Sequence, residues 1–332
     1  MRSVVLTKHG PPEVLQVQER PDPVAGEGQV LVDVKAAGIN FADVMARIGL
    51  YPDAPKPPCV VGYEVAGTVS AVGAGVEGFA EGDRVMAGTR FDGYSELVAA
   101  NALDVVRLPD SISFEQGAAV PVNYSTAYVG LIRYGTLEPG ERVLIHAAAG
   151  GVGIAATQIA KARGAEVWGT ASPGKHDAIR GFGVDHALDY TSSGWEKSVP
   201  PLDLVMDAVG GRSFRTSYDL LRAGGRLVAF GASSVVSGER RNLVTAARAA
   251  LSMPRFNLIK QMSASKSVIG LNMLTLWDEQ GSLERYIGAL EQMLGDGTAV
   301  PVVAESFPFE QAPEAHRFIT ERRNVGKVVL TP

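Results

Sequence analysis

The sequence predicts an α/β protein whose β-rich N-terminal third is followed by a doubly wound parallel sheet. Up to about residue 122, short apolar stretches are separated by Gly and Pro, which is typical of strands joined by loops. From about Asn123, strand-like stretches alternate with helix-like ones, which is typical of a parallel sheet with helical connections. With 332 residues, the chain is long enough for two domains.

The strands of the first third are predicted from period-two patterns. Val30, Val32 and Val34 alternate with residues of the opposite face, and residues 65–72 and 84–86 look similar between flanking glycines. We therefore expect a β-rich domain with long loops over residues 1–122.

The second region begins with a strand, a turn and a helix. Residues 142–147 form a short apolar stretch, residues 151–163 have helical spacing, and Gly164 is a natural helix C-cap. The later strands expected in the same sheet are residues 166–170, 202–207, 226–230 and 268–270. From about Thr298 the chain returns to strand and turn character, and residues 327–330 are expected to pack on the first domain.

Residues 143–160 carry no formal charge, and their number is at the lower limit for a membrane-spanning helix. Gly150, Gly151 and Gly153 fall in the middle of this stretch. These glycines would weaken a helix, whereas a strand–turn–helix unit uses all of them. The membrane-spanning interpretation is therefore disfavoured.

Composition excludes several other classes of protein. Hydrophobic residues make up 46% and charged residues 20%, as in globular proteins, and the formal net charge of -5 argues against bulk binding of nucleic acid. The single cysteine, Cys59, excludes an intramolecular disulfide and a zinc site of several thiolates. Because the first residues lack the apolar region of a signal peptide, we expect a cytoplasmic protein.

The most specific motif is the segment from His146 to Gly153, which joins the predicted strand to the predicted helix. Ala148 stands where a GxGxxG loop has its first glycine. Gly150 lets the backbone approach a pyrophosphate, and Gly153 lets the helix lie near the strand. The predicted dinucleotide contacts in this loop are Ala149, Gly150, Gly151, Val152 and Gly153.

The choice of cofactor depends on the end of the second predicted strand of this region. No carboxylate stands at its tip, because Asp177 falls in the next helix and Glu166 lies at the other end. Ser172 and Lys175 offer a hydroxyl and an ammonium group to a 2′-phosphate, so NADPH is favoured over NADH. The alternative is that Lys175 is only a solvated lysine at a helix start.

A set of ordered motifs resembles the zinc-free quinone oxidoreductase branch of the medium-chain dehydrogenase/reductase superfamily. These motifs are AAGINFAD at 36–43, GYEVAG at 62–67, GDRV at 82–85, TAY at 126–128 and the phosphate loop. Residues 169–176 and 324–330 are most similar to the synaptic vesicle membrane protein (vesicle amine transport) subgroup of that branch.

The resemblance covers nearly the whole chain and implies three segments. They are a GroES-like substrate domain at 1–122, a Rossmann NADPH-binding domain at 123–275, and a helix and strands returning to the substrate domain at 276–332. It also implies a cleft between the two domains and a homodimer.

Zinc-dependent relatives place a cysteine where this chain has Asn40 and a histidine where it has Tyr63. No metal site is therefore predicted, and the superfamily's zinc route to alcohol oxidation is not expected. Cys59, Glu64 and Asp43 remain as an alternative, poor set of zinc ligands.

By resemblance, Asn40 lies near the nicotinamide or its ribose, and Tyr51 lines the substrate pocket. Tyr51 offers a hydrogen bond to developing oxyanion charge, although it could equally contribute only packing. Asn123 is expected to face the cofactor or to cap the following helix. The further cofactor contacts that the resemblance implies are Thr126, Tyr190, Leu271 and Lys327. Phe230 and Gly231 are also expected to contact the cofactor, because they follow the C-terminus of a predicted strand of the doubly wound sheet. His146 is expected to be a packing residue rather than a base.

These residues predict an NADPH-dependent, zinc-independent reductase of a small-molecule quinone or α,β-unsaturated carbonyl compound, with no nucleic-acid partner. The alternative is an NADPH-binding, membrane-associated or interaction protein with little turnover.

Residues 239–266 bear on that alternative, since they are basic and have helical apolar spacing. Arg240, Arg241, Arg248, Arg255, Lys260 and Lys266 stand against only Glu239. Such a segment can lie on an anionic membrane. An insertion that covers the substrate cleft is favoured instead, because Pro254 divides the helix and the net charge opposes membrane attraction.

Overall fold

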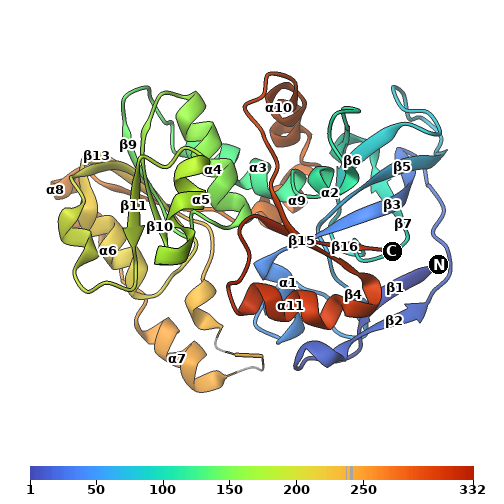
Figure 1. The fold of residues 1–332 in the computed structure, drawn as a ribbon, viewed down its shortest axis with the longest axis horizontal. Coiled ribbons are helices and arrows are strands. Elements are labelled where there is room, and N and C mark those ends of the chain that lie inside the picture. Colours follow the sequence, from blue (N-terminus) through green and yellow to red (C-terminus); the bar gives the residue numbers. More distant parts are fainter. Residues whose placement is uncertain (237, 240–241) are drawn as a thin grey trace.

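Each region of the chain builds its own main sheet, and these two lie side by side in the computed structural model (Figure 1). The N-terminal region also forms a smaller, three-stranded sheet. The structure describes residues 1–236, 238–239 and 242–332. A six-stranded sheet of order β11-β10-β9-β12-β13-β14 is parallel throughout, whereas a larger sheet of order β15-β16-β3-β5-β6-β8 is mainly antiparallel. These two sheets confirm the predicted fold class.

The N-terminal region confirms the period-two prediction. In β3 (Gln29–Ile39), Val30, Val32 and Val34 are all buried. The other elements of this region are β1 (Arg2–Leu6), η1 (Pro12–Val14), β2 (Leu15–Glu19), α1 (Phe41–Arg47), β4 (Cys59–Val60), β5 (Glu64–Val72), β6 (Arg84–Gly88), β7 (Leu97–Asn101), η2 (Ala102–Asp104), β8 (Val105–Arg107) and α2 (Phe114–Gly117).

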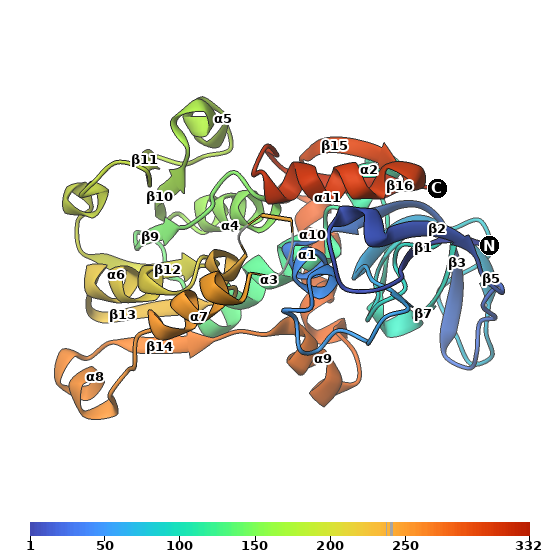
Figure 2. The ribbon, with the colours of Figure 1, turned by 90° about the horizontal axis from the view of Figure 1, so that it is seen from below.

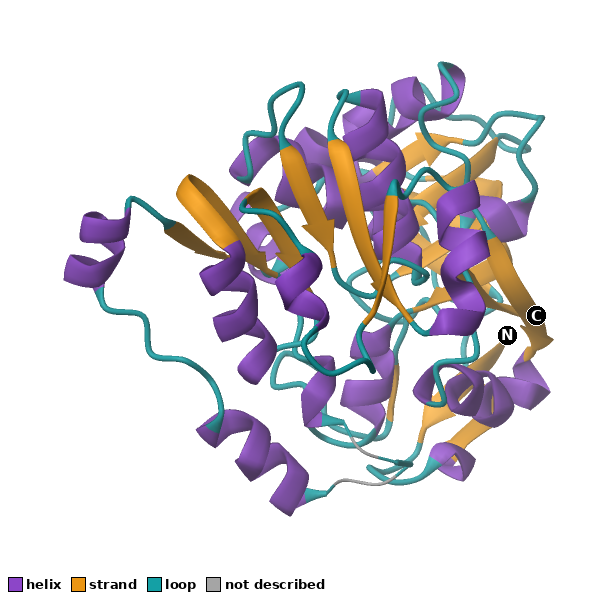
Figure 3. Cartoon of the chain, turned by 60° about the vertical axis from the view of Figure 1, so that its left-hand side comes forward, coloured by secondary structure: helices purple, strands orange, loops and turns teal. Residues whose placement is uncertain are grey.

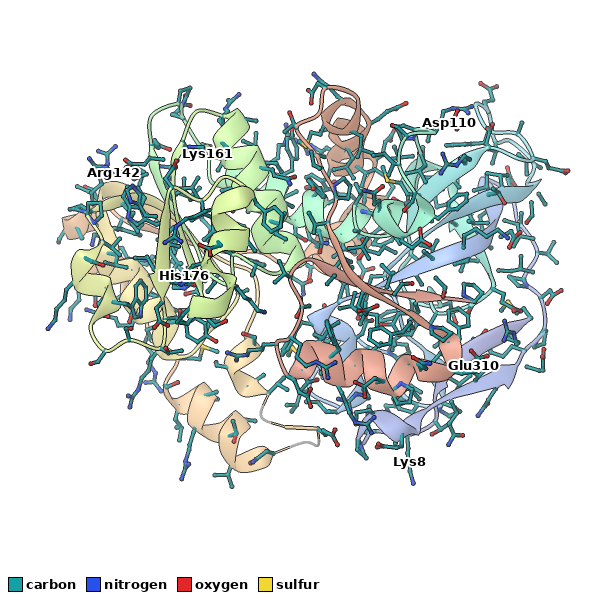
Figure 4. The ribbon with its side chains drawn as sticks, viewed as in Figure 1. Lys8, Asp110, Arg142, Lys161, His176 and Glu310 are labelled. Atoms are coloured by element: carbon teal, nitrogen blue, oxygen red, sulfur yellow. The ribbon has the colours of Figure 1, made fainter. Side chains whose placement is uncertain are left out.

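The parallel sheet is built from alternating strands and helices, as the sequence predicts. Its first part is β9 (Arg142–Ile145), α4 (Gly151–Ala162), β10 (Glu166–Ala171), η4 (Pro173–Lys175), α5 (His176–Gly181), β11 (His186–Asp189) and η5 (Trp195–Ser198). Its second part is β12 (Leu202–Asp207), α6 (Arg212–Leu220), β13 (Leu221–Ala229), η6 (Ser233–Val235) and β14 (Ser267–Gly270). Charged side chains such as Arg142 and Lys161 lie on the outside of this region (Figure 4).

The uncharged stretch 143–160 is divided between β9, the turn after it and α4. Within the described ranges, no helix has both the length and the apolar character that crossing a bilayer needs.

Two helices lie between the regions and join their cores. They are α3 (Pro121–Tyr128), which continues into a π-helical turn η3 (Val129–Tyr134), and α10 (Glu284–Gly295). Tyr124, Leu131 and Leu290 are buried in one apolar cluster that includes residues of both regions. This shared core holds the two regions together on one side of the space between their sheets.

The C-terminal segment returns to the first region. β16 (Lys327–Thr331) pairs antiparallel with β3, with Val328 opposite Ile39, and β15 (Val303–Pro308) pairs with β16. Helix α9 (Met273–Gln280) precedes α10, while η7 (Phe309–Gln311) and α11 (Ala312–Thr320) stand between the last two strands. Figure 2 shows α11 over the N-terminal strands, where it packs against α1 and β2.

The basic segment forms two short helices, α7 (Leu243–Leu251) and α8 (Leu258–Ala264), separated at Pro254 as expected. Both stand outside the parallel sheet in Figure 3. Arg240 and Arg241, which contribute to the predicted basic character, lie outside the described residues.

Candidate active site in the interdomain cleft

A cavity of about 1210 Å³ lies between the two regions. The C-terminal ends of the parallel strands line one side, and the β3–α1 junction, the loop at Tyr51 and the start of β16 line the other. All residues predicted for the site line this one cavity: Asn40, Tyr51, Asn123, Thr126, Ala149, Gly150, Gly151, Val152, Gly153, Ser172, Lys175, Tyr190, Phe230, Gly231, Leu271 and Lys327.

The N-terminus of α4 presents backbone donors to the cavity. The first intrahelical hydrogen bond runs from Ile154 N to Gly150 O at 2.9 Å, so the N–H groups of Gly151, Val152 and Gly153 have no partner within the helix. A Cβ at Gly153 would lie 2.3 Å from the carbonyl oxygen of Ala147. Glycine is therefore required here, and the donor set fits a pyrophosphate.

Asn123 lies within α3 rather than at its start. Its Nδ2 donates to the carbonyl oxygen of Ala119 at 2.9 Å, and a Cβ at Gly151 would come within 2.4 Å of that nitrogen. The capping alternative is therefore wrong, and Asn123 packs directly beneath the phosphate loop.

At the far end of the cavity, Lys175, which the sequence predicts as a contact of the 2′-phosphate, binds the C-terminal segment. The ammonium group of Lys175 donates to the carbonyl oxygens of Arg322 and Asn324, both at 2.6 Å. Burial, and secondarily the charge of Arg322, lowers the pKa of Lys175. Lys175 is therefore not merely a solvated lysine at a helix start.

Arg322 lines the cavity beside Ser172, Lys175 and Tyr190, and the sequence analysis missed it. Its backbone has a φ of 57°, in the left-handed region. The chain separation from Lys175 is 147 residues, so no local pattern brings the two together. The one available signal was that Arg322 precedes the motif at 324–330.

Asn40 is clamped from both sides of its side-chain amide. Its Nδ2 donates to Glu64 Oε1 at 3.0 Å, and its Oδ1 accepts from Lys327 Nζ at 2.7 Å. Lys327 also forms an ion pair with Glu64, and both side chains are buried. This arrangement fixes the amide orientation and leaves the second Nδ2 hydrogen free of the clamp.

Glu64 holds the wall of the cleft as well as Asn40. Its Oε2 accepts from Val122 N at 2.7 Å, at the start of α3. Glu64 thus holds backbone in this wall, as predicted from the sequence. Its pairing with Lys327 was not predicted, because Lys327 was expected to contact the cofactor.

Asp43 supports the β3–α1 junction at Asn40 through hydrogen bonds to backbone. Its two oxygens accept from Asn40 N at 2.7 Å and from Gly62 N at 3.0 Å. Burial raises the pKa of Asp43 to about 7, although these hydrogen bonds oppose the shift. The support for Asn40 therefore includes a carboxyl group that titrates near neutral pH.

Aromatic side chains line the other part of the cavity. The rings of Tyr51 and Tyr63 meet edge to face with centroids 6.4 Å apart, and Phe91 packs on Tyr63 at 5.2 Å. Burial raises the pKa of Tyr51 to about 12 and that of Tyr63 further still. Both phenols therefore remain protonated donors at neutral pH, and the Tyr63 hydroxyl has no partner among the described residues.

The alternative zinc ligands do not converge. Glu64 is held by Lys327 and Asn40, Asp43 accepts from backbone, and Cys59 Sγ contacts the carbonyl oxygen of Pro55 at 3.5 Å. Burial raises the pKa of Cys59 to about 11, which disfavours the thiolate. Across the described part of the chain, no three His, Cys, Asp or Glu side chains gather as a metal site requires.

His146 lies in a buried polar chain. Its Nε2 is 3.0 Å from Ser217 Oγ and its Nδ1 is 3.2 Å from Thr170 Oγ1. Ser217 itself donates to Asp207 Oδ2 at 2.7 Å, so it is not a nucleophile activated by histidine. Burial lowers the pKa of His146, and the residue supports the strand end as expected.

The basic segment does not cover the cavity. None of its described residues lines it; Glu239 instead accepts from Arg47 through its carbonyl oxygen at 2.9 Å and from Arg317 through Oε1 at 2.8 Å. The expectation of an insertion over the substrate cleft is therefore wrong for the described residues.

Comparison with family models matches two segments of the chain. Residues 26–178 match the alcohol dehydrogenase GroES-like domain, and residues 182–330 match the zinc-binding dehydrogenase family. The human synaptic vesicle membrane protein VAT-1 homolog is 37% identical over 340 residues, covering 100% of this chain and 86% of that protein.

Two solved structures are similar over almost their full length. Escherichia coli quinone oxidoreductase complexed with NADPH has a TM-score of 0.85 and 31% identity, covering 100% of each chain. CurK enoyl reductase has a TM-score of 0.87 and 27% identity, covering 99% of this chain and 98% of the other.

Proposed function

The chain belongs to the medium-chain dehydrogenase/reductase superfamily and is an oxidoreductase, and from this premise we propose a specific activity. It is a zinc-independent, NADPH-dependent reductase that transfers a hydride to a quinone or an α,β-unsaturated carbonyl compound. The observation that carries the proposal is the clamp of Lys327 and Glu64 on Asn40. The Asn40 amide occupies the position where zinc-dependent relatives have a cysteine ligand. The ammonium group of Lys327 beside it would repel a metal cation.

The residues of the cavity fit NADPH, which supplies the hydride when bound. The free N–H groups of Gly151, Val152 and Gly153 bind the pyrophosphate. Ser172, Lys175 and Arg322 are the proposed contacts of the 2′-phosphate. The similar Escherichia coli enzyme is described as complexed with NADPH, which supports this choice.

The aromatic end then holds the acceptor. The protonated Tyr51 hydroxyl donates to the carbonyl oxygen as negative charge develops on it, and the second Nδ2 hydrogen of Asn40 is available on the same cavity. Tyr63, which lines the cavity and packs on Phe91, excludes water around the reacting carbon. The resulting enolate or hydroquinone anion takes its proton from water.

The protein forms a homodimer in this proposal. Strand β14 is at one edge of the parallel sheet, so its outer backbone groups are available to a second copy. Light scattering after size-exclusion chromatography measures the mass, and a monomer at all concentrations would contradict this assignment.

The proposal also includes a small-molecule substrate, no nucleic-acid partner and a cytoplasmic location.

A second candidate is an NADPH-binding, membrane-associated or interaction protein with little turnover. It is favoured by the exposed apolar side chains of the basic segment, such as Leu251 at 87% and Leu258 at 75%. The name of the VAT-1 relatives points the same way. Peripheral membrane contact is compatible with both candidates and is not required by the first.

The test is NADPH oxidation by chelator-treated protein with a panel of quinones and enones. Saturable turnover that is faster with NADPH than with NADH supports the reductase. Tight NADPH binding without turnover of any acceptor favours the second candidate, and loss of activity on chelation favours a zinc enzyme.

A further inference from the structure

Among the described residues that line the cavity, Asp53 is the carboxylate beside Tyr51 at the aromatic end. Asp53 follows Tyr51 and Pro52, and all three residues line the cavity. The carboxylate is exposed to the cavity and solvent rather than buried in the wall. It therefore faces the space where the acceptor is held in the proposed function.

The position of this carboxylate is fixed from across the cleft. Asp53 Oδ2 accepts from Asn272 Nδ2 at 3.2 Å, and Asn272 belongs to the turn between β14 and α9. The Asn272 amide is itself oriented, because its Oδ1 accepts from Leu274 N at 3.0 Å. The bridge joins the substrate-domain loop to the opposite wall.

The cations near this end are already neutralised. Arg90, which lies close enough to interact with Asp53, is bound by both oxygens of Asp278, and Lys327 is paired with Glu64. Lys175 and Arg322 lie together at the nucleotide end, and Arg212 starts α6 on the wall of the parallel sheet. Among the described residues, no cation forms an ion pair with Asp53, and the two cations nearest the aromatic end are paired with other carboxylates.

We infer that Asp53, held by Asn272, determines the charge specificity of the acceptor. The site takes neutral quinones and enones and disfavours those that carry a sulfonate, carboxylate or phosphate near the carbonyl. Like charges a few ångströms apart in a partly exposed site weaken binding on the order of tenfold. This inference rests on the proposed function for the place of the acceptor but not for turnover.

Binding to NADP⁺-loaded protein tests the inference without relying on catalysis. The probes are 1,4-naphthoquinone and its 2-sulfonate, and the readout is the ratio of their two dissociation constants by calorimetry. In Asp53→Asn, which keeps the size and an acceptor for Asn272, we expect the sulfonate to bind about tenfold more tightly while the neutral quinone changes less than about twofold. High salt should reduce the discrimination of the unmodified protein.

Two further variants separate charge from position. Glu77→Gln removes one exposed carboxylate that does not line the cavity, and should leave the ratio unchanged. Asn272→Ala removes the bridge but keeps the charge, so most of the discrimination should remain. An unchanged ratio in Asp53→Asn, or an equal shift in Glu77→Gln, would overturn the inference.

Measurements on the same protein variants distinguish failure of the inference on Asp53 from failure of the proposed function. If NADPH is not oxidised with any neutral quinone or enone, the proposed reductase activity fails, whereas the ratio of dissociation constants still decides the role of Asp53.

Discussion

At the start of α4, the proposed nucleotide end of the cleft, the chain offers mainly backbone groups, whereas around Asn40, at the proposed acceptor end, it offers side chains held by other side chains. Gly151, Val152 and Gly153 present N–H groups that one helix start provides. Asn40, in contrast, depends on Lys327 and Glu64, which come from distant strands. We therefore expect substitutions to act sterically at the start of α4 and electrostatically around Asn40.

The largest effect is expected from breaking the ion pair under Asn40. In Lys327→Met, Glu64 is left buried without its cation, which should lower the free energy of unfolding by about 3–5 kcal/mol. Denaturant unfolding measures the loss. The double variant Lys327→Met/Glu64→Gln should recover much of it, and a double variant as unstable as the single one would contradict the electrostatic explanation.

The steric expectation is tested at Gly153. In Gly153→Ala, the new Cβ would meet backbone atoms of Ala147 and Ala148 that cannot move aside, which should cost about 1–3 kcal/mol of stability and weaken NADPH binding. Gly174→Ala is the matched control near the same end, since a Cβ there meets no atom within 4 Å. Equal effects at the two positions would refute the steric account.

The free energy of unfolding should depend on pH through Asp43, which supports Asn40 at the proposed acceptor end. The folded pKa of Asp43 is raised to about 7, so the stability that its neutral form contributes is complete below the ordinary pKa of an aspartate and is lost as pH rises through about 7. Asp43→Asn also loses one accepted hydrogen bond, so it should be less stable than the unmodified protein at low pH.

Thermal unfolding at about pH 5 and about pH 8 measures this effect. The stability gap between the unmodified protein and Asp43→Asn should narrow by about 2 kcal/mol at the higher pH. A gap that stays constant or widens would show that Asp43 does not titrate in this range.

The smallest expected effect concerns the choice of nucleotide. Lys175→Ala should weaken NADPH by about tenfold and NADH little, because only NADPH has a 2′-phosphate for the ammonium group to bind. Arg322→Ala should act in the same direction. Fluorescence titration with both nucleotides measures the two affinities, and equal weakening would remove the argument for NADPH.

The sequence predicted the elements whose signals are local. The alternation at Val30, Val32 and Val34 predicted β3, and the run of small residues after β9 predicted the turn into α4. Helix α11 was missed within a segment interpreted only as strands and turns, although its buried Ala312 and Ala315 have helical spacing.

The missed parts of the site are contacts between residues far apart in the chain. The bridge from Asn272 to Asp53 spans 219 positions, and the hydrogen bond from Lys327 to Asn40 spans 287. Neither has a periodic pattern or spacing that indicates it. Arg322 escaped notice for the same reason, because only the tertiary fold places it beside Lys175.

Hydride transfer without a metal is tested most directly by following an isotope from NADPH to the product. NADPH deuterated at the transferred position is incubated with chelator-treated protein and an enone that turns over, and the saturated product is examined by mass spectrometry. The account predicts one deuterium at the β-carbon of the product. Product without deuterium, or product formed only after zinc is restored, would contradict it.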